Sequence, residues 1–234
     1  PFTTTRCLEQ IRVGVAYHEA PVVIVGTGSG LSYAELGATH HSLEDLAILR
    51  SIPNLQICAP ADSIELEAQL REAVTSDKPT YIRIGKKGEP NLFKDKNNMG
   101  IGKANLIKHG KDSLIIGIGP IISEGIEAIE KLSSEGINVG IASMGSIKPL
   151  DEDFLLQAIS DGYTKWISLE EHYISGGLGS TLLEWLNDND YLDTVKLKRI
   201  GICDEFIHEL GRQSYIRNIK KIDSKGIYEK VIEA

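Results

Sequence analysis

Gly37-Ala-Thr-His-His-Ser-Leu-Glu-Asp45 places two adjacent histidines between an apolar run at residues 21–26 and a segment at 42–51 that we expect to be helical. This order predicts that His40 and His41 lie at the carboxyl end of a strand, where open α/β sheets form their binding crevices. Histidine at such a place suits proton transfer near neutral pH. The alternative is a purely structural histidine pair on the surface or in the core. The stretch therefore predicts both an α/β fold and a candidate site.

The start of the helix that follows has its own sequence signals. Thr39 and Ser42 are candidate N-caps, because either hydroxyl can accept a hydrogen bond from the first free N–H groups of a helix. Glu44 and Asp45 then place negative charge in the first turn, where the helix dipole favours it. We therefore expect a rigid helix start that holds the two histidines in place.

Strands and helices alternate along both halves of the chain. Apolar runs predict strands at residues 21–26, 55–58, 79–84, 104–108, 113–119, 137–141, 166–169 and 195–200. Apolar periodicity and capping residues predict helices at 3–20, 42–51, 63–75, 122–135, from 149, 176–185, and from 225 to the end. The alternation indicates parallel strands joined by crossover helices, so the predicted fold class is α/β with two small parallel-sheet domains. The wholly apolar run at 21–26 should be buried on both faces of its sheet.

A polar stretch at residues 85–99 interrupts this alternation and has the composition of a linker. We therefore predict one domain at residues 1–88, a linker at 89–103 and a second domain at 104–234. The chain starts at Pro1 directly before a helix, which we interpret as an interior start, with an upstream segment removed, left out or encoded elsewhere. The first domain should then be incomplete at its N-terminus, and its sheet should have an unpaired or uncovered side.

Composition narrows the class of protein. The 234 residues are 41% hydrophobic and carry a formal net charge of −8, which is typical of a globular protein and argues against broad binding to nucleic acid or anionic membranes. There is no apolar run of roughly 20 residues that could span a bilayer, and no signal peptide is visible. Cys7, Cys58 and Cys203 lie far apart without a C-x-x-C pattern, so we expect neither disulfides nor a zinc site, and a cytoplasmic location.

The segment Glu170-Glu-His-Tyr-Ile-Ser-Gly-Gly-Leu-Gly-Ser180 is the second distinctive stretch. Two acids and a histidine close a predicted strand, and glycines precede a predicted helix. Free N–H groups at such a helix start can hold an anion. The spacing is not that of the dinucleotide-binding G-x-G-x-x-G pattern, so we favour close packing of helix, strand or subunit as the reason for the glycines.

Taken together, three stretches resemble the transketolase family of thiamine-diphosphate enzymes. Arg6-Cys-Leu-Glu-Gln-Ile-Arg12 is similar to a helix of the family's pyrimidine-binding domain. The Gly37–Asp45 stretch resembles its active-site loop and continues into similar segments at residues 49–54 and 59–62. Ile147-Lys-Pro-Leu150, with the Glu170–Gly179 stretch, resembles its C-terminal domain. The resemblance covers nearly the whole chain.

The resemblance implies a three-domain subunit whose first domain binds the diphosphate through Mg²⁺, whose second binds the aminopyrimidine ring and whose third helps to form a homodimer. This chain is similar to the later part of the second domain and all of the third. The Mg²⁺ ligands and the glutamate that activates thiamine diphosphate are therefore expected on an N-terminal domain or partner subunit, with no metal ligand here, and the chain alone should be inactive. The implied reaction transfers a two-carbon ketol unit between sugars or sugar phosphates, and the thiazolium ring supplies the carbanion chemistry.

Four residues carry the implied site. His40 matches the active-site histidine of the family loop, with hydrogen bonding and proton transfer as its expected task and loop shaping as the alternative. His41 is a second candidate for substrate binding, or it caps the helix. Phe2 is the candidate aromatic that stacks on the pyrimidine ring, with core packing as the alternative. Lys86 is the candidate contact for a substrate phosphate, and Arg6 is expected to be structural.

The chain departs from sugar-phosphate transketolases at three positions. Gly28 stands near a family histidine, Leu36 stands where an aspartate reads a ketose hydroxyl, and Lys86 stands where an arginine holds the substrate phosphate. Lysine lacks the bidentate fork of arginine, and a leucine would leave a sugar hydroxyl unpaired at a cost of roughly 1–3 kcal/mol. We therefore hypothesise that the substrate is a modified sugar, such as one linked to a nucleotide, rather than an ordinary pentose phosphate pair.

Three alternatives remain open from the sequence. Within the same chemistry, the chain could be similar to deoxyxylulose-phosphate synthase or to the β subunit of oxo-acid dehydrogenases, although the Thr-His-His-Ser loop favours transketolase. In a different class, it could be a non-catalytic assembly partner that keeps only the fold. Leu36 and Gly28 favour that third possibility, whereas the intact His40 loop argues against it.

Overall fold

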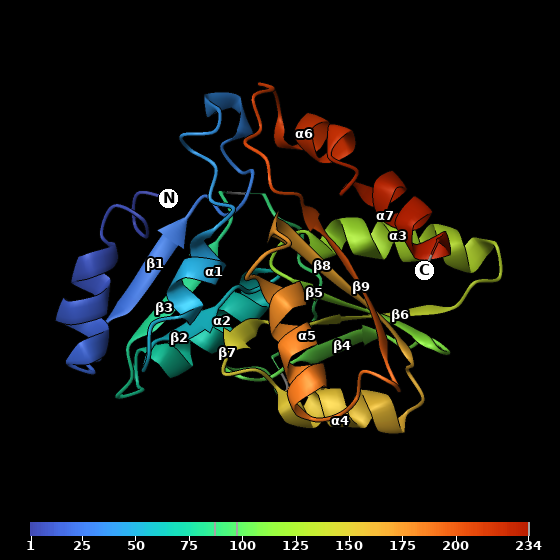
Figure 1. Ribbon diagram of the computed structural model, residues 1–234, viewed down its shortest axis with the longest axis horizontal. Helices are drawn as coiled ribbons and strands as arrows, with labels where there is room; N and C mark the ends of the chain where they lie inside the picture. Colours follow the sequence, from blue (N-terminus) through green and yellow to red (C-terminus); the bar gives the residue numbers. More distant parts are fainter. Residues whose placement is uncertain (87, 97, 234) are drawn as a thin grey trace.

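The computed structural model describes residues 1–86, 88–96 and 98–233, so Lys87, Asn97 and Ala234 lie outside the described residues. Two β-sheets lie side by side, each covered by helices (Figure 1). The first sheet contains the N-terminal strands, and the second contains strands from residue 105 onward. The predicted fold class, two small α/β domains, is confirmed.

The first sheet has the strand order β1-β3-β2-β7. Its members are β1 (Val23–Thr27), β2 (Gln56–Cys58), β3 (Thr80–Ile84) and β7 (Ser146–Lys148). β1, β2 and β3 are parallel, as predicted, and β7 pairs antiparallel with β2. Since β7 comes from the second half of the chain, backbone hydrogen bonds join the two halves.

Helices cover both faces of this sheet because its side chains alternate between two apolar clusters. Ile57 and Tyr81 face the cluster that includes η1 (Gln10–Tyr17) and α1 (Asp45–Arg50). The next residue on each strand faces a cluster that includes Ala73 of α2 (Ser63–Ala73). The period of two along the strands therefore places α1 and α2 on opposite faces.

The second sheet has the order β4-β6-β5-β8-β9. Its strands are β4 (Asn105–Lys108), β5 (Ser113–Ile118), β6 (Val139–Ser143), β8 (Lys165–Tyr173) and β9 (Lys196–Ile202). β4 pairs antiparallel with β6, and the other pairs are parallel. Each sheet thus carries one antiparallel strand at its edge in addition to the predicted parallel strands.

Four helices cover the second sheet. One face packs against α3 (Ile122–Ser134) and α7 (Ser224–Ile232). The other packs against α4 (Glu152–Ser160) and α5 (Leu178–Asp188), and this apolar cluster continues into the residues of η1 and α1. One apolar cluster therefore extends across the boundary between the two domains.

Several predicted elements differ from the observed ones. The predicted helix at residues 3–20 is shorter, because regular π-helical structure spans only Gln10–Tyr17 and turns precede it. The prediction that the first strand is buried on both faces is wrong: β1 is an edge strand, and Val25 is 42% exposed. Three short elements were not predicted, namely η2 (Ala34–Leu36), β7 and α6 (Gln213–Ile219).

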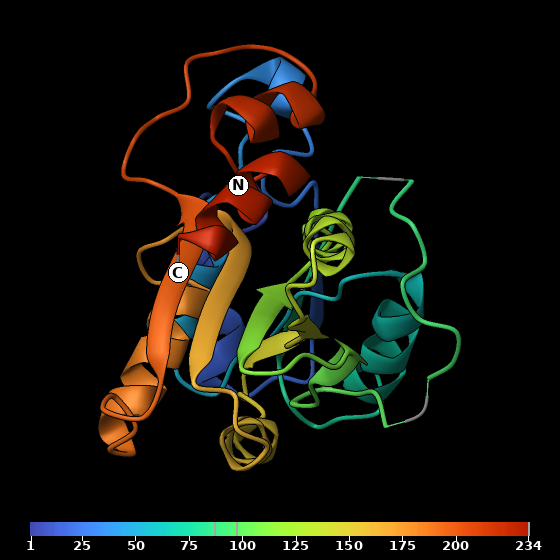
Figure 2. The ribbon, with the colours of Figure 1, turned by 90° about the vertical axis from the view of Figure 1, so that its right-hand side faces the viewer.

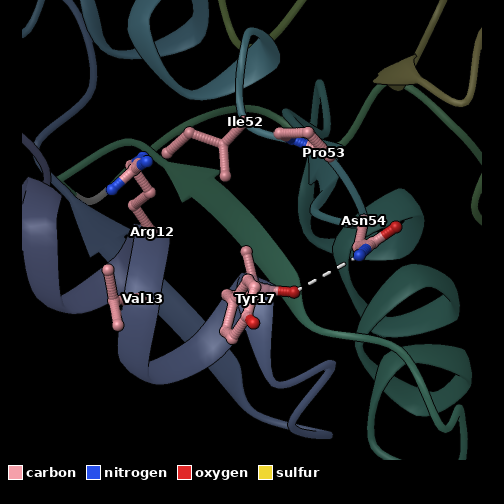
Figure 3. Close-up of a pocket in the computed structure, with 7 residues that line it drawn as sticks. Arg12, Val13, Tyr17, Ile52, Pro53 and Asn54 are labelled. Atoms are coloured by element: carbon pink, nitrogen blue, oxygen red, sulfur yellow. Dashed lines mark hydrogen bonds between the residues drawn. The ribbon is translucent and has the colours of Figure 1, made fainter.

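An open groove of about 340 Å³ lies beside η1 (Figure 3). Figure 3 shows Val13 and Tyr17 on the helix facing Ile52 and Pro53 on the connection after α1. Separately, β1 stands at the edge of its sheet, with β3 as its neighbour on one side among the described residues. Within the described residues, no helix is both long and apolar enough to cross a membrane.

Glu65 is a buried acid at the junction of the two domains. Its carboxylate accepts hydrogen bonds from the Ala61 N–H at 2.7 Å, from the Ser143 hydroxyl on β6 at 2.9 Å and from the Asn105 amide on β4 at 3.0 Å. Burial raises the pKa of Glu65 to about 7, although these hydrogen bonds oppose the change. Glu65 of α2 therefore links the domains, and its raised pKa predicts that this link depends on pH.

We expect the junction to weaken as the pH rises. The folded-state pKa of Glu65 is raised above its usual value of 4.5. The protonated side chain therefore contributes its full stabilisation below pH 4.5, and this contribution is lost as the pH rises through about 7. Glu65→Gln does not titrate. The unfolding free energy of the wild type should therefore fall relative to Glu65→Gln by roughly 3 kcal/mol between about pH 4.5 and 8 in urea unfolding. Glu127→Gln, at an exposed position of α3, is the control; a difference for Glu65→Gln that stays flat with pH would contradict the assignment.

Candidate functional site

The loop at residues 28–42, called here the His40 loop, leaves the end of β1 and returns to the start of α1. Its base is closed by an antiparallel bridge, in which the Gly30 N–H donates to the Ser42 carbonyl at 3.0 Å and the Ser42 N–H donates back at 2.9 Å. Near the tip, the His40 N–H donates to the Gly37 carbonyl at 2.9 Å. The φ of Gly37 is 79°, a left-handed conformation that favours glycine. The loop therefore presents the histidine pair on a closed turn beyond the strand.

His40 and Phe2 meet, although they are far apart in the sequence. Their ring centroids are 5.1 Å apart and the rings are nearly perpendicular, at 82°. Phe2 is 42% exposed, and the Arg6 guanidinium lies 4.4 Å from its ring centroid. The Nδ1 of His40 lies 3.0 Å from the Thr39 hydroxyl, and within the described residues its Nε2 has no protein partner. The structure thus places an imidazole nitrogen and an aromatic surface together, both open to a ligand.

His41, by contrast, is buried and only 4% exposed. Burial lowers its pKa, while a hydrogen bond with the backbone of Ala34 and the charge of Glu171 oppose that change. Its Nε2 is buried without a hydrogen-bond partner among the described residues. His41 is therefore placed to support the loop from inside rather than to cap the helix.

The N-caps predicted for α1 are wrong. The helix begins at Asp45, and its N-cap residue Glu44 makes no side-chain capping hydrogen bond. The Ala47 N–H instead donates to Nε2 of His172, on β8 of the second domain, at 3.3 Å. Burial lowers the pKa of His172 to about 4, which keeps the ring neutral so that Nε2 can accept. A residue remote in sequence thus takes the role that we assigned to Thr39 and Ser42.

An ion pair buried beneath the loop was also missed. Arg83 on β3 and Asp45 on α1 are 2% and 1% exposed, and Nε of Arg83 lies 2.9 Å from the carboxylate, which also accepts from the Tyr81 hydroxyl at 2.8 Å. Burial alone would raise the pKa of Asp45, but the charges of Arg83 and His172 and the hydrogen bonds from Tyr81 and Arg83 together outweigh it, so the pKa lies below its usual value. A sequence signal did exist: an arginine within the apolar strand needs a buried partner.

Lys86 contacts the His40 loop through two of its residues. Its Nζ lies 2.8 Å from the Glu35 carboxylate and 4.5 Å from the ring centroid of Tyr33. The Tyr33 ring in turn covers Gly28, where any larger side chain would have no room: a Cβ there would lie 2.2 Å from the ring. The side chain expected to hold a phosphate is therefore already paired with an acid, and a tyrosine takes the space at the position of the family histidine.

The Glu170–Ser180 segment serves internal contacts. Glu170, Glu171 and His172 are all buried within this chain. The carboxylate of Glu170 accepts from the N–H groups of Leu178 and Gly179 at 2.8 and 2.9 Å. The group that accepts from this helix start is thus the protein's own carboxyl, and the packing explanation for the glycines is supported. Among the described residues there is no group of His, Cys, Asp or Glu side chains that could hold a metal ion.

Comparison with known proteins gives the class. Residues 1–89 match the transketolase pyrimidine binding domain, and residues 102–222 match the transketolase C-terminal domain. An apulose-4-phosphate transketolase subunit of Phocaeicola vulgatus is 34% identical over 233 residues, which are 99% of this chain and 73% of that protein. The 1-deoxy-D-xylulose-5-phosphate synthase of Halothermothrix orenii is 36% identical over 230 residues, which are 97% of this chain but 36% of that protein.

A solved structure agrees with these relatives. A split gene transketolase, described as an inactive β4 tetramer, superposes with a TM-score of 0.87 at 29% identity over 100% of this chain and 73% of that one. The fold and the matched domains define part of a transferase assembled from α/β domains. The chain belongs to the transketolase family, so the predicted resemblance is confirmed. This is a family of thiamine-diphosphate enzymes, and the chain spans about a third of the length of its synthase relative.

Proposed function

We propose that this chain is the C-terminal part, or a subunit, of a thiamine-diphosphate-dependent transketolase that transfers a two-carbon ketol unit between sugars. The observation that carries the proposal is the contact between His40 and Phe2, at 5.1 Å between ring centroids, on a turn at the end of a parallel strand. His40 acts as the acid/base group through its open Nε2. Phe2 offers its exposed ring surface to the aminopyrimidine of the cofactor.

The residues present fit the pyrimidine end of the cofactor. An aromatic ring that is 42% exposed has free surface for stacking, and Arg6 lies over it. The bound cofactor supplies the thiazolium chemistry. The tasks of this chain are then to orient the ring through Phe2 and to move a proton at Nε2 of His40. Mg²⁺, which we assign to the cofactor's diphosphate, has its ligands on an N-terminal domain or partner subunit.

The N-terminal partner is the second element of the proposal. A relative named as one subunit of a transketolase supports a divided enzyme, as does a solved split gene transketolase. The exposed edge of β1 and the groove beside η1 offer a surface for such a partner. We propose a homodimer of the complete unit in the cytoplasm, where the three free cysteines stay reduced.

The residues near the loop bear on the substrate. Lys86 can bind a phosphate only in competition with Glu35. Leu36 is 51% exposed at the position where a polar side chain would hydrogen-bond a sugar hydroxyl. We therefore propose an acceptor or donor that differs from an ordinary pentose phosphate pair. A relative named for apulose 4-phosphate supports a sugar phosphate outside that pair, and a nucleotide-linked sugar stays a prediction.

The test combines the chain with an N-terminal partner subunit. We expect saturable thiamine-diphosphate binding only in the combined sample, followed by ketol transfer in a screen of donors and acceptors with and without phosphate. Transfer from xylulose 5-phosphate to ribose 5-phosphate at ordinary transketolase rates would contradict the substrate proposal. Accumulation of 1-deoxy-D-xylulose 5-phosphate would favour synthase activity instead, and cofactor binding without any turnover would favour an assembly role.

A further inference from the structure

Glu171 lies at the junction between the His40 loop and the second domain. It stands on β8, is 4% exposed, and its Oε1 accepts a hydrogen bond of 2.7 Å from the Leu31 N–H at the base of the loop. The carboxylate packs closely against Gly30, because a Cβ placed on this residue would lie 2.4 Å from the same oxygen. The φ of Gly30 is 56°, which also favours glycine. The base of the loop is therefore fitted to this one carboxylate.

The other contacts of Glu171 come from α6. The amide of Gln213 donates to Oε1 at 2.8 Å, and Nε of Arg217 donates to Oε2. Nη1 of Arg217 also pairs with Glu124 of α3 at 3.1 Å. One carboxylate thus joins the loop base to α6, and an ion pair fixes α6 to the rest of the second domain.

The same helix packs against the tip of the loop. α6 lies beside η2 in both ribbon views (Figures 1 and 2). Leu210, just before α6, packs against Gly37: a Cβ placed on this glycine would lie 3.1 Å from the leucine side chain. The Gly37 carbonyl is the group that accepts the hydrogen bond from the His40 N–H. The second domain therefore contacts the loop at its base, through Glu171, and at its tip, through α6 and the segment before it.

A second connection strengthens the base. Nη2 of Arg83 donates to the backbone carbonyl of Ser42 at 2.7 Å and to that of Glu171 at 3.0 Å. The Tyr173 N–H donates to the Leu43 carbonyl at 2.8 Å. The end of β8 thus holds both strands of the loop base at once.

We propose that Glu171 is a positioning residue: with Gln213 and Arg217 it makes the second domain fix the His40 loop, and so holds His40 against Phe2. The inference rests on the proposed function for its link to catalysis. Its structural part concerns the loop alone. Displacing a catalytic group by about 1 Å can lower the reaction rate by up to about 100-fold, so the effect on activity should be measurable.

The test is Glu171→Gln in the full chain, with Glu127→Gln, at an exposed position of α3, as the control. A glutamine has one carbonyl oxygen, so it cannot accept from both Leu31 and Arg217, whereas Glu127→Gln removes an acid that lies outside these contacts. Amide hydrogen exchange across residues 28–42 should rise at least about tenfold in Glu171→Gln and stay near wild type in the control. With the N-terminal partner, kcat should fall roughly 10- to 100-fold while the Kd for thiamine diphosphate stays the same.

The outcomes separate this inference from the proposed function. The positioning role would be overturned if amide hydrogen exchange across residues 28–42 is equal in the two variants. It would also be overturned if this exchange is faster in Glu171→Gln while kcat is unchanged. If the wild-type assembly shows no ketol transfer, the proposed function fails, and the exchange measurement still decides whether Glu171 fixes the loop. If Glu171→Gln does not fold, Gln213→Leu, which removes one of the two α6 contacts to Glu171 and leaves that of Arg217, should give a smaller rise in amide exchange of the loop; no rise would again overturn the inference.

Discussion

Replacing Arg83 by methionine is expected to lower the free energy of unfolding by roughly 3–5 kcal/mol. Methionine fills much of the space but leaves the Asp45 carboxylate buried at 1% exposure without its counter-charge. It also removes the donor to the carbonyls of Ser42 and Glu171. A buried charge that loses its partner costs far more than an exposed one, because water cannot replace the lost interaction.

Urea unfolding of the full chain measures this loss. Arg71→Met, which removes an exposed pair with Glu67 on α2, is the control and should leave the stability close to wild type. Adding Asp45→Asn to Arg83→Met removes the orphaned charge and should recover part of the stability. An Arg83→Met chain within about 1 kcal/mol of wild type would show that the pair does not hold the base of the His40 loop.

Elements with local signals were predictable from the sequence. The helix α2 begins at residue 63 as predicted, and the carboxylate of Asp62 accepts from the N–H groups of Ile64 and Glu65, both within three residues. The strands β2, β3 and β5 were found for a similar reason, since a short apolar run between turns already determines them.

Elements that depend on remote partners were not predictable in this way. The start of α1 is satisfied by His172, whose position follows only from the packing of the two domains. β7 has three residues and forms its strand by pairing with β2 of the other half. Propensity and periodicity contain no information about such contacts, so the caps were assigned to Thr39 and Ser42.

The candidate site shows the same division. His40, His41, Phe2 and Lys86 were chosen from the resemblance to a family, and the structure brings Phe2 to His40 and Lys86 to the loop through Glu35. The sequence did not indicate Glu171 and Arg83 as site residues, because both act through hydrogen bonds to backbone groups that are remote in sequence. Their roles, like those of the four chosen residues, stay proposals until they are measured.

Replacing His40 by asparagine is expected to lower kcat for ketol transfer by roughly 10²- to 10⁴-fold in the complete enzyme, the usual contribution of a positioned acid/base group. His40→Phe keeps a ring beside Phe2 but removes both nitrogens, and it should lose as much. Cofactor binding should be little changed in His40→Phe, because Phe2 keeps an aromatic neighbour. His109→Asn, at an exposed position of the second domain, is the control for a histidine outside the site.

The two variants distinguish the possible roles of His40. If proton transfer at Nε2 limits the rate, asparagine cannot replace imidazole, since its amide does not titrate near neutral pH. If hydrogen bonding to the substrate is the whole contribution, His40→Asn should retain far more activity than His40→Phe. Activity of both variants within about threefold of wild type would leave His40 only the shaping of its loop, and the acid/base group would then have to come from the partner subunit.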